Sequence, residues 1–121
     1  MAKTILIADD NDDLRSILGY QLQQAGYRVL MAPDGGQAIE KARQEKPDLI
    51  ILDVLMPGLD GTEAASSLKV DPVTARIPVI FLTALIQGNE PSATEEGVTF
   101  PKSTDSSFLL SKIRELLEKT G

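Results

Sequence analysis

Short runs of apolar residues, alternating with stretches of helical spacing, constrain this fold more than any other feature of the sequence. The runs lie at residues 4–8, 27–31, 49–52 and 79–82, and residues 98–100 form a weaker fifth. Apart from Arg28 in the second, the first four runs show little alternation of apolar and polar residues. Strands buried on both faces have this pattern, which is typical of a parallel sheet covered by helices.

The first helix is expected directly after the first run. Its apolar stripe consists of Leu14, Ile17, Leu18, Leu22 and Ala25. The spacing of these residues places them on one face of a helix. Gly26 should end the helix, because glycine adopts the left-handed conformation that often follows a helix. We expect Asp12 or Asp13 to be the N-cap.

Further helices are expected along the rest of the chain. Asp34 should cap the second, a third should span about residues 62–70, and the last includes residues 109–117. The polar segment 87–96 would form only a short or irregular helix, since it contains both glycine and proline. Strands and helices that alternate in this way predict one α/β domain over residues 1–121, with right-handed crossovers.

The composition excludes several classes of chemistry. The chain has no cysteine and no histidine, which rules out disulfides, thiolate metal sites and Cys–His or Ser–His catalysis. Its net charge is −6, whereas direct nucleic-acid binding needs a basic surface, so we expect none from this domain. No apolar run approaches the roughly 18 residues of a membrane span, and the N-terminus lacks a signal-peptide pattern. We expect a cytoplasmic protein with no membrane partner.

Polar and charged residues follow the apolar runs, at the points where the strands should end. They are Asp9 and Asp10 after the first run, Asp53 after the third, Thr83 after the fourth and Lys102 after the fifth. Parallel strands end at the same edge of a sheet, so these side chains should converge there. Clustered carboxylates repel one another unless a cation is present. Lys102 supplies one positive charge, and Mg²⁺, which binds carboxylates and water, would supply the rest.

Four local motifs resemble those of a known family. They are Asp9-Asp10, the segment DVLMPGLDG that begins at Asp53, Thr83-Ala84, and Pro101-Lys102. In order and approximate spacing they are similar to receiver domains of two-component response regulators, including single-domain chemotaxis regulators. The resemblance covers essentially the whole chain. It implies a flavodoxin-like (βα)5 three-layer sandwich with a five-stranded parallel sheet of order 2-1-3-4-5.

The resemblance also implies a phosphoryl acceptor and a metal site. Asp53 would accept a phosphoryl group from a phosphohistidine and form an acyl phosphate. Asp10, Asp53 and the main-chain carbonyl of Leu55 would bind Mg²⁺ directly, and Asp9 would act through water. The metal would orient the phosphoryl group and neutralise its oxygens.

Other implied roles concern the bound phosphoryl group and the partners. Lys102 would form an ion pair with the group, and Thr83 would donate a hydrogen bond to it. Leu55 and Leu85 would flank the path of attacking water, and because both are apolar we expect slow self-dephosphorylation. The domain would thus catalyse its own phosphoryl transfer without being a metabolic enzyme. Its partners would be a sensor histidine kinase or phosphotransfer protein, and a downstream effector protein or output domain.

Two positions depart from the family pattern and leave an alternative open. Thr99 stands where relatives usually carry an aromatic residue, and Ser103 where proline usually follows the lysine. Both lie on the side used for output, so the alternative is a receiver-like interaction module that acts without phosphorylation. A flavin carrier of the same fold is disfavoured by the acidic Asp9-Asp10 turn. An aspartyl phosphatase is disfavoured by Leu55, where such enzymes need a second acid.

Overall fold

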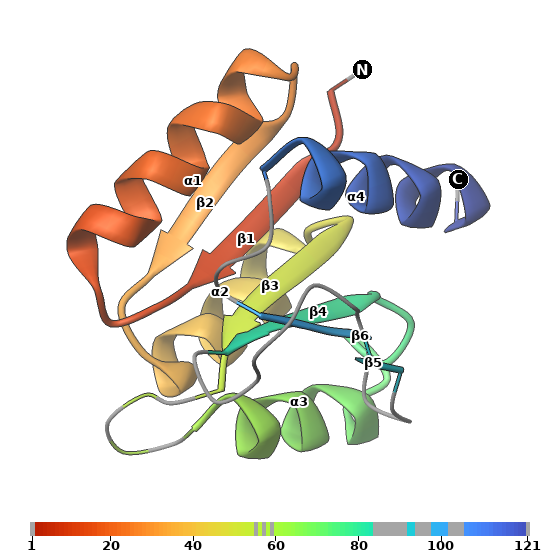
Figure 1. Cartoon of the computed structure of the whole chain (residues 1–121). Helices are drawn as coiled ribbons and strands as arrows, with labels where there is room; N and C mark the ends of the chain where they lie inside the picture. The colour runs from red at the N-terminus through yellow and green to blue at the C-terminus, as the bar shows by residue number, and fades with distance from the viewer. Residues whose placement is uncertain are drawn as a thin grey trace.

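The computed structural model describes residues 2–54, 56, 58, 60–83, 92–93, 98–101 and 106–120. Its strands are β1 (Thr4–Ala8), β2 (Arg28–Ala32), β3 (Leu49–Asp53), β4 (Val79–Thr83), β5 (Ser92–Ala93) and β6 (Val98–Pro101). Its helices are α1 (Asp12–Gln24), α2 (Gly35–Glu45), α3 (Gly61–Val70) and α4 (Ser106–Thr120). The sheet lies between two helical layers, α1 and α4 on one face and α2 and α3 on the other (Figure 1). None of the described helices is long and apolar enough to cross a membrane.

Five strands run parallel in the order β2-β1-β3-β4-β6, which confirms the expected topology with β6 as its fifth strand. β5 adds two residues that pair antiparallel with β6 at the edge of the sheet. The irregular helix expected over residues 87–96 is therefore wrong at Ser92–Ala93, and the other positions of that segment lie outside the described residues. The short pairing covers part of an otherwise open sheet edge.

Side chains of the central strands alternate between the two helical layers. On β1, Leu6 and Ala8 pack on the side of α2 and α3, whereas Ile5 and Ile7 pack on the side of α1 and α4. Because both faces are covered, all residues of β3 are buried. Each of the five expected strands differs from the observed one by at most one residue at either end.

The ends of α1 correct one expectation and confirm another. Asn11 is the N-cap, where the sequence suggested Asp12 or Asp13, and its side-chain oxygen accepts a hydrogen bond from the N–H of Leu14 at 3.1 Å. The two aspartates instead occupy the first turn, where negative charge is favourable. Gly26 follows the helix with φ 97°, a conformation that favours glycine.

The expected apolar stripe of α1 is broader than the face that the helix buries. Leu18, Gly19 and Leu22 are buried against the sheet. Ile17 is 60% exposed and Ala25 is also exposed, so these two members of the expected stripe do not pack against the sheet. A helix on the outside of a sheet needs only a narrow contact stripe, and residues at the margins of that stripe stay in solvent.

Aspartates cap two further helices. At the start of α2, Asp34 accepts a hydrogen bond from the N–H of Gln37 at 2.8 Å, which confirms the expected cap. At the start of α3, Asp60 accepts bonds from the N–H of Glu63 at 2.9 Å and from the hydroxyl of Thr62 at 2.7 Å. The bond from the Glu63 N–H, helped by the Thr62 hydroxyl, lowers the pKa of Asp60 below its ordinary value.

This lowered pKa predicts how stability depends on acid. The folded pKa of Asp60 lies below the unfolded one, so its stabilisation is present above pH 3.8, the ordinary value, and is lost as the pH falls further. Asp60→Ser keeps a capping oxygen without a titrating group, so its melting temperature should fall less steeply in acid. Asp60→Ala, which loses the cap at every pH, controls for capping alone. Equal acid slopes for the wild type and the serine variant would contradict this assignment.

Candidate functional site

Three carboxylates meet at the carboxyl edge of the sheet. Asp9 and Asp10 follow β1, and Asp53 ends the adjacent strand β3, with Ala8 in register with Leu52. One carboxylate oxygen from each aspartate lies within 4.8 Å of those from the other two. Asp9 and Asp53 are each 3% exposed, whereas Asp10 is exposed. The structure thus brings together the three acids that the sequence places at the ends of these strands.

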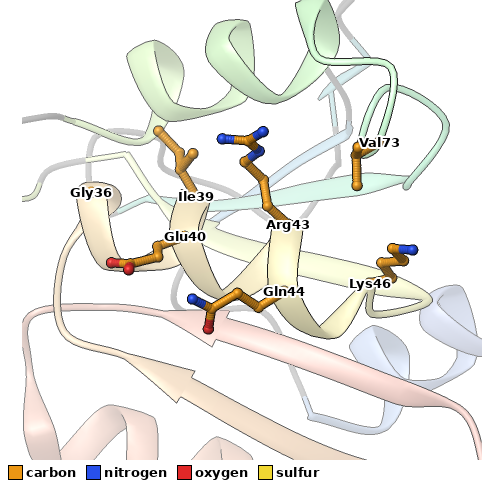
Figure 2. Close-up of a pocket in the computed structure, with 7 residues that line it drawn as sticks. All are labelled: Gly36, Ile39, Glu40, Arg43, Gln44, Lys46 and Val73. Atoms are coloured by element: carbon orange, nitrogen blue, oxygen red, sulfur yellow. The ribbon is translucent and has the colours of Figure 1, made fainter.

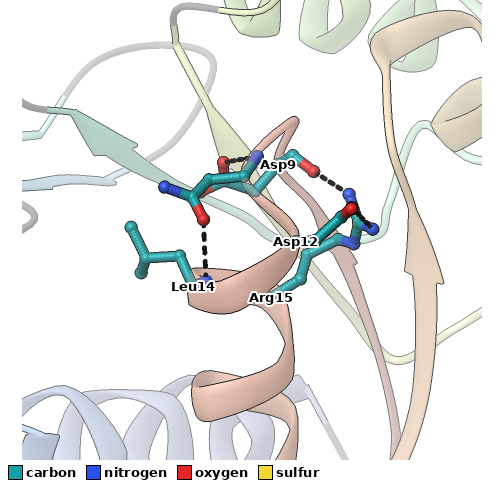
Figure 3. A network of polar contacts seen from close by, with 5 residues as sticks. Asp9, Asp12, Leu14 and Arg15 are labelled. Carbon is teal, nitrogen blue, oxygen red and sulfur yellow. Dashed lines mark hydrogen bonds and ion pairs between the residues drawn. The ribbon is translucent and has the colours of Figure 1, made fainter.

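The turn between β1 and α1 is held by hydrogen bonds on both sides of Asp9 (Figure 3). The N–H of Asn11 donates to Oδ1 of Asp9 at 2.9 Å. The guanidinium of Arg15 donates to the main-chain carbonyl of Asp9 at 2.5 Å and also contacts the carboxylate of Asp12. The main-chain N–H of Asp9 donates to the carbonyl of Ala32 on β2. The side chain and both main-chain polar groups of Asp9 are therefore engaged.

The end of β3 is fixed by its neighbours in a similar way. The N–H of Val54 donates to the carbonyl of Leu82 at 3.1 Å, which continues the pairing with β4 beyond Asp53. The carbonyl of Val54 accepts from the N–H of Gly61 at 3.0 Å, where α3 begins. Gly61 has no room for a side chain, because an added Cβ would collide with the main chain of Asp53. Asp53 therefore lies between a sheet neighbour and the start of a helix.

The remaining expected site residues are described in part. Thr83 is the last residue of β4, in register with Pro101 of β6, so its main chain lies at the same sheet edge as the acids. Leu55 and Lys102 lie outside the described residues. Phe100 is 1% exposed and its ring packs edge-on against Phe108.

The donor set suits a hard divalent cation. Its three carboxylates offer only oxygen ligands, which Mg²⁺ prefers, and two of them are buried beside each other. Bringing like charges together at this distance is unfavourable, and a bound divalent cation offsets that repulsion. The exposed position of Asp10 leaves one side of the cluster open to solvent. The residues present therefore fit Mg²⁺ with water completing its coordination.

The sequence analysis assigned no structural role to two residues around the cluster. Arg15 is the one basic residue close to the acidic segment DDNDD, and its spacing from Asp12 is that of a helical ion pair, which was the available signal. Gly61 follows the cap Asp60 in an Asp-Gly pair at the start of a helix. A sequence motif shows that glycine is present there, but only coordinates show that the space beside Asp53 excludes a Cβ.

A cavity of about 610 Å³ lies along α2 (Figure 2). Its lining residues are Gly36, Ile39, Glu40, Arg43, Gln44, Lys46 and Val73. None of the three clustered aspartates contributes to it, and Arg43 forms an ion pair with Asp71 at 2.7 Å. The cavity therefore offers a mixed-charge surface and no group of metal ligands.

Comparison with protein families and curated proteins gives a consistent result. The family model described as the response regulator receiver domain matches residues 5–98. The chain is 39% identical over 127 aligned positions to the phosphate regulon transcriptional regulatory protein PhoB of Pseudomonas aeruginosa, covering 100% of this chain and 54% of that protein. The chain spans between 26% and 54% of the length of the first curated relatives that it matches.

Solved structures with the same fold cover nearly the whole chain. A putative response regulator from Chloroflexus aurantiacus aligns with a TM-score of 0.86 and 31% identity, over 98% of this chain and 99% of that one. The chemotaxis protein CheY4 of Vibrio cholerae aligns with a TM-score of 0.80 and 26% identity, over 96% and 99%. These similarities agree with the observed order of the five parallel strands.

Proposed function

The chain belongs to the response regulator receiver domain family, and from this premise we propose that it is a phosphorylation-dependent switch with Asp53 as phosphoryl acceptor. The observation that carries the proposal is the convergence of Asp53 with Asp9 and Asp10 at the carboxyl edge of the sheet. Clefts at this edge are where open α/β sheets bind their ligands. We assign residues 1–121 to one receiver domain.

The proposed reaction follows from the chemistry of the cluster. A carboxylate oxygen of Asp53 attacks the phosphorus of a phosphohistidine; a P–O bond forms as the P–N bond breaks, and the leaving imidazole keeps that electron pair and takes a proton. Asp9 and Asp10, with Asp53, would hold Mg²⁺, which supplies positive charge to the phosphoryl oxygens. Because Asp9 and Asp53 are buried, neighbouring groups limit the movement of both carboxylates, which favours a positioned nucleophile. By the family pattern, Lys102 and Thr83 would contact the phosphoryl group and the Leu55 carbonyl would complete the protein ligands.

The proposed partners are a protein that donates the phosphoryl group and a protein or domain that responds to the phosphorylated chain. The donor would be a sensor histidine kinase or phosphotransfer protein, because the chain has no histidine of its own to phosphorylate. The downstream partner would be an effector protein or an output domain. Relatives such as PhoB carry the name of transcriptional regulators, and this chain matches about half of that protein.

Phosphorylation with a small donor tests the proposal directly. After incubation with acetyl phosphate and Mg²⁺, intact-mass spectrometry should show one added phosphoryl group, and reductive trapping should locate it on the peptide containing Asp53. Omitting Mg²⁺ should strongly reduce the product. A protein that stays unmodified would favour the alternative, a receiver-like module that acts without phosphorylation. The observation behind that alternative is Thr99, which is half-buried where relatives usually have an aromatic residue.

Metal binding should stabilise the fold by an amount that mass action fixes. At about ten times the dissociation constant, Mg²⁺ should add about 1.4 kcal/mol to the free energy of unfolding. Asp10→Ala should lose most of this gain, and its metal-free form should melt at or above the wild-type temperature because one like charge is gone. Asp13→Ala removes an exposed acid outside the cluster and should keep the full gain. An Asp10→Ala variant that Mg²⁺ stabilises as much as the wild type would contradict the assignment.

A further inference from the structure

Arg15 lies in the first turn of α1 but is directed back toward the end of β1 (Figure 3). Its Nη1 donates to the main-chain carbonyl of Asp9 at 2.5 Å, and its Nη2 pairs with Oδ1 of Asp12. The Arg15 side chain is 15% exposed, whereas that of Asp12 is 83% exposed. An arginine removed from water to this extent in a helical first turn is held in one conformation by the groups that it bonds.

The bond to Asp9 acts on the main chain that carries Asp10. The carbonyl of Asp9 and the N–H of Asp10 belong to the same planar peptide unit, so fixing the carbonyl direction fixes the orientation of that unit. The Asp9 side chain has a separate restraint, the N–H of Asn11. Asp10 is the exposed member of the acidic cluster. Within the part of the chain that the structure describes, its side chain has no hydrogen bond comparable to the one that Asn11 donates to Asp9. The orientation of the Asp9–Asp10 peptide sets where the Asp10 side chain leaves the main chain, and therefore which positions its carboxylate can reach.

We propose that Arg15 is a positioning residue that holds the Asp9–Asp10 peptide so that the Asp10 carboxylate points toward those of Asp9 and Asp53. The proposal deepens the function proposed above and rests on it, because the cluster matters only if it binds a cation. Residues that orient metal ligands in this way typically affect affinity although they do not touch the metal.

Whether removal of Arg15 weakens or strengthens Mg²⁺ binding distinguishes a positioning role from a purely electrostatic one. Arg15 is positively charged, so its removal would strengthen binding of a cation if charge alone mattered. Asp12 pairs with the guanidinium and offsets much of that charge. If Arg15 acts by fixing the peptide, its removal should weaken binding instead.

The test is a calorimetric Mg²⁺ titration of the wild type and three variants, with melting temperatures measured in parallel. Arg15→Met keeps an unbranched side chain suited to a helix and should weaken Mg²⁺ binding about tenfold, at the lower end of the 10–100-fold loss seen for groups that orient ligands. Arg15→Lys keeps the charge but not the fork of donors, and should bind with an intermediate affinity. Arg28→Met removes an exposed arginine that pairs with Glu45, and should bind like the wild type.

Amide hydrogen exchange of residues 9–11, measured without metal, gives a second readout, since exchange there should be faster in Arg15→Met than in Arg28→Met. Unchanged or tighter Mg²⁺ binding by a folded Arg15→Met would overturn the positioning role while leaving the proposed function standing. If Arg15→Met does not fold, Arg15→Lys decides the matter, and wild-type affinity in that variant would overturn the role. A wild-type protein that binds no Mg²⁺ would overturn both.

Discussion

Asp53→Asn is expected to abolish labelling of the protein by acetyl phosphate. The substitution keeps the shape of a side chain that is 3% exposed, but its amide lacks the carboxylate oxygen that would attack phosphorus. The loss should be complete on the scale of the measurement, because none of the remaining groups is expected to replace a nucleophile held at the end of β3. Intact-mass spectrometry of the wild type and the variant, run side by side with Mg²⁺, gives the readout.

A matched substitution controls for the removal of negative charge. The control is Asp60→Asn. Asp60 caps α3 near the same edge of the sheet, and it is not a member of the acidic cluster. This variant should be labelled like the wild type. Circular dichroism should show that both variants are folded. Undiminished labelling of a folded Asp53→Asn would disprove the assignment of the acceptor and direct attention to Asp10.

The strands and the position of the candidate site could be predicted because they depend on burial. Strands covered on both faces need apolar residues along most of their length, so β1 from Ile5 to Ala8 and β3 from Leu49 to Leu52 appear in the sequence as unbroken apolar runs. Parallel strands end at the same edge of a sheet, and the strand order implied by the family resemblance makes β1 and β3 neighbours, so the acids that follow them should lie close in space. Asp9, Asp10 and Asp53 converge for this reason, and their places at the ends of apolar runs, together with the implied strand order, predict it.

Some features could not be predicted, because the sequence allows several alternatives of similar energy and a single tertiary contact selects among them. Asn11, Asp12 and Asp13 are all good N-caps, and the selection of Asn11 depends on where β1 ends. Ile17 is apolar at a helical spacing, yet it lies just outside the narrow stripe that contacts the sheet. The pairing of Ser92–Ala93 with β6 depends on an open sheet edge, which local sequence does not encode.

Gly61→Ala is expected to destabilise the fold by about 3 kcal/mol, at the upper end of the range for overpacking. A Cβ at this position would lie 2.9 Å from the carbonyl carbon of Asp53 and 3.0 Å from Cα of Val54, and closer still to the carbonyl oxygen of Asp53. All three are main-chain atoms, so no flexible side chain can move aside. Relief requires α3 to separate from the end of β3, which would lengthen the hydrogen bond from Gly61 to Val54. Urea unfolding measures the loss.

Two other helical glycines test whether the collision, rather than the loss of a glycine, causes this effect. At Gly36 an added Cβ would meet only Oδ1 of Asp34 at 3.5 Å, so Gly36→Ala should be neutral or gain up to about 1 kcal/mol from helix propensity. At Gly19 the obstacle is the end of the Met31 side chain, which can rotate away, so Gly19→Ala should fall between the two. Because the displaced main chain belongs to Asp53, Gly61→Ala should also weaken Mg²⁺ binding in the fraction that remains folded. Equal stability of the Gly61 and Gly36 variants would show that α3 can shift without strain, and that the end of β3 does not depend on this close contact.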